Sequence, residues 1–119
     1  MTKEIQLPDF EDMYKLLKEI EALALKKLLM SEAIDLREAE IILEVSSNGD
    51  YYVNGKPPTM TFINKTYLRK GLKGNLPKMR EQLARVLAEY EYVKKKFDLD
   101  KIAIDVWRTQ SANKRKVID

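Results

Sequence analysis

The side chains with the clearest chemical potential lie in the middle of the chain. Residues 51–80 contain neither Asp nor Glu. The bases of this stretch are Lys56, Lys65, Arg69, Lys70, Lys73, Lys78 and Arg80. Lysine and arginine make the phosphate contacts of nucleic-acid-binding proteins, and a stretch without carboxylates keeps the positive potential that attracts a polyanion. We therefore take these seven side chains as candidate nucleic-acid contacts.

Aromatic residues accompany these bases. Tyr51, Tyr52 and Tyr67 are candidate stacking partners, because exposed rings can stack on unpaired bases. Lys65 and Arg69 are four residues apart, so on a helix they share one face. If residues 60–70 are helical, a break at 71–75 before the next helix has helix-turn-helix spacing. The same pattern also fits a solvated lysine-rich surface or a site for an acidic protein partner.

Catalytic chemistry is restricted by composition. The chain of 119 residues has no cysteine and no histidine. It therefore lacks disulfides, thiol nucleophiles, thiolate metal sites and the usual general base. Ser46 and Ser47 have no histidine to activate them, and Gly71–Gly74 lacks the Lys-Ser/Thr end of a phosphate-binding P-loop. We expect a protein that is not an enzyme and has no cofactor and no metal site.

Length and hydropathy fit one domain, residues 1–119. The mean hydropathy is −0.44, and no apolar run approaches the 18 or so residues of a membrane span. The first residues have no apolar core of a signal peptide. We therefore expect a cytoplasmic protein without a membrane segment.

The helix-breaking residues divide the chain into two arms and a centre. All four glycines and three of the four prolines lie between residues 49 and 77. Glycine and proline cost roughly 1 and 3 kcal/mol inside a helix. The sequence therefore predicts a helical arm over 9–46, a basic head over 47–75 and a second helical arm over 76–113.

The second arm shows regular spacing of apolar residues, at intervals of 4, 3, 4, 3 and 4. These residues are Met79, Leu83, Val86, Tyr90, Val93 and Phe97. Such spacing is typical of a coiled-coil seam, and Ile104 and Trp107 keep the same phase. Asn75 is a good N-cap, and Pro77 fits the first turn.

The first arm begins with a similar signal. Asp9 is a good N-cap, and two acids follow it in the first turn, where the helix dipole favours them. One apolar stripe is predicted, made of Phe10, Met13, Leu17, Ile20 and Ala24. Residues 41–46 fit either a continued helix or a strand leading into the Asn48-Gly49 turn.

The basic head has turn signals at Asn48-Gly49 and Asn54-Gly55, with strand-forming residues 51–53 between them. A β-hairpin is therefore expected here. After the two prolines, Thr59 or Thr61 could cap a short helix with its apolar side chains on one face. Alternatively, residues 59–63 form a strand that pairs with 51–53.

These elements combine into a mainly α fold. We expect an antiparallel, coiled-coil-like hairpin of two long helices with a small basic middle segment, self-associating through its helical arms. The layout is similar in architecture to that of prefoldin-type chaperone subunits, with no residue motif in support. The expected function is that of a small accessory protein that binds DNA or RNA through phosphates. The alternative is a protein-interaction or chaperone-like adaptor that oligomerises through its arms.

Overall fold

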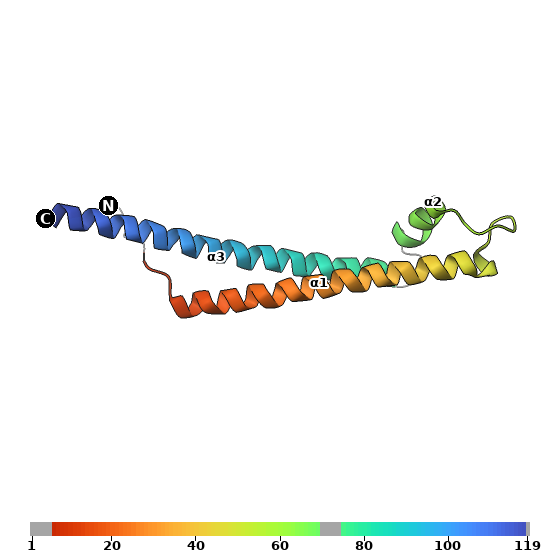
Figure 1. Ribbon diagram of the computed structural model, residues 1–119, viewed down its shortest axis with the longest axis horizontal. Helices are drawn as coiled ribbons and strands as arrows, with labels where there is room; N and C mark the ends of the chain where they lie inside the picture. Colours follow the sequence, from red (N-terminus) through yellow and green to blue (C-terminus); the bar gives the residue numbers. More distant parts are fainter. Residues whose placement is uncertain (1–5, 70–74, 119) are drawn as a thin grey trace. The chain divides into compact units, whose positions relative to one another are not determined.

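The computed structural model describes residues 6–69 and 75–118. Its elements, shown in Figure 1, are α1 (Phe10–Ser47), a short 3₁₀-helix η1 (Gly49–Tyr51), α2 (Met60–Ile63), a π-helix η2 (Asn64–Arg69) and α3 (Leu76–Ile118). Helix α1 packs against α3, which confirms the predicted all-α helical hairpin.

Helix α1 begins where the sequence predicts. The Glu11 N–H donates to Asp9 Oδ1 over 2.9 Å, and the Met13 N–H donates to the Asp9 carbonyl over 3.0 Å. Asp9 is therefore the N-cap of α1, and its side chain satisfies one of the N–H groups that lack an intrahelical partner.

Residues 41–46, for which the sequence allows helix or strand, are helical. Ile41 and Val45 are four residues apart and both are fully buried, whereas Leu43 between them is 70% exposed. A strand would place all three side chains on one face, because its side chains alternate. Burial at helical spacing therefore decides in favour of the helix, which continues to Ser47.

Helix α3 also begins as predicted, since the Met79 N–H donates to the Asn75 carbonyl over 2.9 Å. It continues to Ile118, five residues beyond the predicted end. The predicted seam is confirmed: Val86 and Val93 are buried, and the other seam residues up to Phe97 are half-buried. Trp107 keeps the seam phase but is 40% exposed.

Two compact units divide the chain, and both long helices contribute to each unit. Residues 25–87 form the unit that contains the basic head. Its core joins α1, the head and the start of α3 through the buried residues Ile34, Ile41, Val45, Ile63, Leu68 and Leu76. The head is thus fixed to the helices by long-range apolar contacts.

The other unit combines the start of α1 with residues of α3 from position 88 onward. Met13, Leu23 and Val93 are buried in it. Part of the predicted α1 stripe differs, because Phe10 and Leu17 are 62% and 39% exposed. The buried face of α1 in this unit also includes Leu23.

The predicted β-hairpin is wrong, since the described residues contain no strand. Val53 and Lys56 form a single antiparallel bridge with hydrogen bonds of 2.9 and 3.1 Å. Asn54 and Gly55 make the turn between them with φ values of 55° and 77°, as a type I′ turn requires. Pro57-Pro58 follows at once and offers no N–H groups, so the pairing cannot extend.

The remaining head elements follow from side-chain caps. Asn48 accepts a hydrogen bond from the Asp50 N–H over 3.0 Å and starts η1. Thr59 Oγ1 accepts from the Phe62 N–H over 3.3 Å and caps α2. The short helix predicted from Thr59 is therefore confirmed, and the alternative strand over 59–63 is wrong. Gly71, predicted as the stop of this helix, lies outside the described residues.

Candidate nucleic-acid interface

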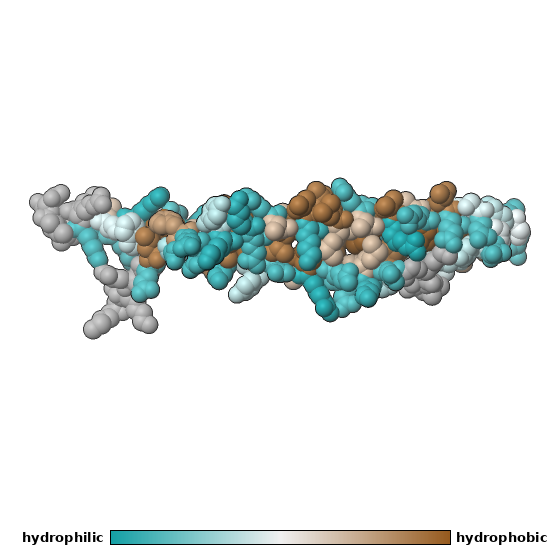
Figure 2. Space-filling model, turned by 90° about the horizontal axis from the view of Figure 1, so that it is seen from below, coloured by the Kyte–Doolittle hydropathy of each residue, from teal (hydrophilic) through white to brown (hydrophobic). Residues whose placement is uncertain are grey.

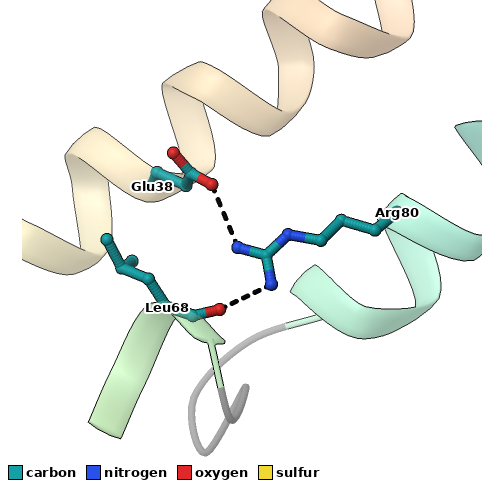
Figure 3. Close-up of polar contacts among 3 residues, drawn as sticks. All are labelled: Glu38, Leu68 and Arg80. Atoms are coloured by element: carbon teal, nitrogen blue, oxygen red, sulfur yellow. Dashed lines mark hydrogen bonds and ion pairs between the residues drawn. The ribbon is translucent and has the colours of Figure 1, made fainter. Parts of the chain in front are cut away.

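Arg80 has a structural contact that the sequence did not predict. Its guanidinium donates to the Leu68 carbonyl over 2.6 Å and to Glu38 Oε1 over 3.0 Å, as Figure 3 shows. These bonds connect α1, the end of η2 and the second turn of α3. Both side chains of the ion pair are about two-thirds covered. The guanidinium is therefore committed to the fold, and we do not include Arg80 among the phosphate contacts that we propose.

Two of the three candidate tyrosines are also engaged within the fold. The rings of Tyr51 and Tyr67 meet edge to face, with centroids 5.7 Å apart and an interplanar angle of 87°. Both pack against the apolar core. Edge-to-face contacts of this kind add about 0.5–1.5 kcal/mol beyond area burial. Tyr51 and Tyr67 therefore orient the head and are poorly placed to stack on bases.

Phe62 is the outer member of the same aromatic cluster. Its ring lies 6.2 Å from that of Tyr67 at 72°, yet 41% of the residue is exposed. Ile63, the next residue, is fully buried. Because neighbouring helical residues point about 100° apart, burying Ile63 turns Phe62 outward. Phe62 was not among the stacking candidates chosen from the sequence. Its position beside an apolar residue on the predicted short helix is the signal that could have indicated an exposed ring.

A shallow apolar groove of about 290 Å³ lies beside Phe62. It is lined by Val53, Lys56, Pro57, Pro58, Thr59 and Phe62. The type I′ turn fixes the positions of Val53 and Lys56 in the lining of the groove. The two prolines keep the next segment of the lining extended. The groove thus combines an aromatic face with one exposed cation, Lys56.

Lys65 and Arg69 are exposed and line a second groove of about 310 Å³ on η2, together with Thr61 and Asn64. The structure therefore brings these two cations to one side of the head. Neither makes an ion pair with another residue within the described ranges. Their charges are available to a ligand.

The other predicted contacts are distributed as follows. Lys78 is exposed in the first turn of α3, and Tyr52 is 38% exposed at the end of η1. Lys70 and Lys73 lie outside the described residues, as does most of the predicted turn at 71–75. Only part of the predicted set is therefore placed on the head surface.

In the parts of the chain that the structure describes, no three metal-ligating side chains come together, and no helix has the length and apolar composition needed to cross a membrane. Comparison of the chain with protein-family models, with curated proteins and with solved structures gave no match.

Proposed function

We propose that the protein binds single-stranded nucleic acid through the basic head. One observation supports this most strongly: two exposed cations without acid partners among the described residues lie on η2, directly after the short helix α2 that carries an exposed aromatic ring. Lys65 and Arg69 on η2 supply charge, and Phe62 on α2 supplies a flat apolar face beside the neighbouring groove.

The chemistry of a single strand matches both features. Its phosphates pair with Lys65, Arg69 and Lys56, and each paired phosphate releases condensed counterions. An unpaired base can enter the groove beside Phe62, whereas a base in a duplex keeps its faces covered by its neighbours. Stacking on an aromatic ring contributes about 1–3 kcal/mol per base and tolerates any sequence. We therefore expect binding with little sequence preference and with a preference for single strands over duplex.

The test removes two charges of the head. Lys65→Ala combined with Arg69→Ala should weaken binding to every single-stranded oligonucleotide and make the log–log salt slope shallower by about 1.4. An electrophoretic shift across a salt series measures both effects. Lys95→Ala with Lys96→Ala, which removes two exposed cations of α3, is the matched control. Equal losses from both pairs would show that the protein's general charge, and not the head, causes the binding.

A protein-interaction role is the second candidate, favoured by a separate observation. Helix α1 exposes several leucines on the side away from its core contacts. A partner bound there would be held by apolar burial, so its affinity would change little with salt. Absence of any shift at low salt would favour this second candidate.

A further inference from the structure

Helix α1 has a second apolar face in the unit formed by residues 25–87. Five leucines there are more than half exposed, and Figure 2 shows hydrophobic side chains reaching the surface of the protein. They are Leu25 (58%), Leu28 (54%), Leu29 (55%), Leu36 (62%) and Leu43 (70%). We call these five residues the outer leucine stripe. Large apolar side chains gathered on one face of a monomer indicate an interaction site.

The outer leucine stripe lies opposite the buried face of α1. Ile34 is buried, and it is nine residues from both Leu25 and Leu43. Nine residues make 2.5 helical turns, so Ile34 points away from both leucines. The core contacts of this unit therefore leave the stripe uncovered.

The spacing of the stripe fits a helical partner. Leu25 and Leu36 are separated by 11 residues, and the same interval relates Leu28 to Ala39 and Glu32 to Leu43. An 11-residue repeat averages about 3.67 residues per turn, which keeps a stripe nearly parallel to the axis of a straight helix. A second helix can therefore follow the stripe along its length.

We propose that this second helix is α1 of another copy of the chain, packed antiparallel with its centre near Ile34. Leu25 and Leu43 are equidistant from that point, whereas Leu28 faces Glu40 of the second copy. Leu25 then meets Leu43 of the second copy, and Leu29 meets the small Ala39. Each of these two contacts occurs twice, as in a twofold symmetric interface.

Charge selects the antiparallel direction over the parallel one. Residues 32–44 contain five acids and one base, so parallel packing would place this acidic segment against its own copy. Antiparallel packing instead places Lys26 near Glu40 of the second copy. Because the interface is twofold symmetric, this contact occurs twice. Both residues are exposed and lie on the same flank of the stripe. Such pairs set direction and partner choice in helix pairs.

One carboxylate weakens the proposed dimer, so its removal should strengthen the association. Glu32 lies within the stripe close to the proposed twofold axis, where its carboxylate faces Leu36 of the second copy. A contact along one helix is also small beside the ~800 Å² per partner of a standard interface. We therefore expect a dimer that dissociates in the micromolar range.

Sedimentation equilibrium of the full chain, from low to high micromolar concentration, tests the proposal. The wild type should approach a dimer, and Leu36→Glu with Leu43→Glu should raise the dissociation constant at least about tenfold. Leu99→Glu with Ile102→Glu, at comparably exposed positions of α3, is the control and should keep the wild-type constant. Glu32→Leu should tighten the dimer. A monomeric wild type, or a stripe variant as dimeric as the wild type, would overturn the proposal.

Direction is tested by cross-linking, because the chain has no cysteine of its own. A mixture of chains with Leu25→Cys and chains with Leu43→Cys should form mainly the mixed 25–43 disulfide on oxidation. Mainly same-site disulfides would indicate parallel packing, and the absence of cross-links would indicate a different surface. Either result rejects the antiparallel interface. The cross-linking test still applies if the stripe variant and the control variant both fail to dimerise in sedimentation.

Discussion

Arginines and aromatic rings lie on both sides of the region formed by the basic head and the start of α3, and the two sides use them differently. On the side facing α1, Arg80 bonds Glu38 and a carbonyl, and Tyr67 lies between two other rings. On the solvent side, Arg69 and Phe62 are exposed. The comparison shows that an acid-free stretch of sequence can have an acidic neighbour in space. Contacts, and not residue types, separate structural from ligand-binding side chains.

The largest expected effect is on the inner side. Ile63→Ala should lower the free energy of unfolding by about 2–4 kcal/mol, because it leaves a cavity in a fully buried site. Urea unfolding followed by circular dichroism measures this loss. Phe62→Ala, one residue away and exposed, is the control and should cost less. Equal losses at the two positions would mean that the head has no inner and outer sides.

Phe62→Ala should have its main effect on binding. Loss of one stacking platform should reduce the affinity for a single strand by about 1–3 kcal/mol and leave the affinity for duplex nearly unchanged. Fluorescence anisotropy with matched single-stranded and duplex oligonucleotides measures both. Met60→Ala, an exposed apolar residue on the same short helix, serves as control. A loss that is equal for single strand and duplex would exclude stacking.

Arginine substitutions give the most symmetrical comparison. Arg80→Met should lower the unfolding free energy by about 1–2 kcal/mol, because the Leu68 carbonyl and Glu38 lose their donor. Arg69→Met should change stability by no more than about 0.5 kcal/mol but should make the salt slope of binding shallower by about 0.7. The reverse outcome, with Arg80 controlling binding, would invalidate the division between the two sides.

The smallest effect is expected at the turn that supports the groove. Gly55→Ala should cost about 1 kcal/mol, because φ is +77° there and a side chain disfavours the left-handed region. Gly49→Ala should be nearly neutral, since no atom lies within 4 Å of the added Cβ and φ is ordinary. Thermal unfolding of the two variants checks this difference, and similar melting temperatures would argue against a fixed turn.

Local signals made the helical arms predictable. The Asp9 cap, the start of α3 after Asn75 and the 4-3 spacing of α3 all depend on residues close in sequence. The I′ turn at Asn54-Gly55 was also a local prediction, but Pro57 prevented the strands that such a turn usually joins. The rest depended on distant partners.

Two features of the candidate sites could not be read from local patterns. Arg80 and Glu38 are 42 residues apart in the chain, so their pairing becomes visible only when α1 and α3 meet. The apolar residues of α1 occupy two opposite faces, and spacing alone does not say which face is buried. Packing of the core against Ile41 and Val45 makes that decision.

The salt dependence of wild-type binding tests the central claim most directly. Fluorescence anisotropy with a single-stranded oligonucleotide should give a log–log slope of about −2, as expected for three phosphate contacts from Lys56, Lys65 and Arg69. Binding of the matching duplex should be weaker at every salt concentration. No binding at the lowest salt concentration, or an affinity that does not change with salt, would contradict nucleic-acid recognition by the basic head.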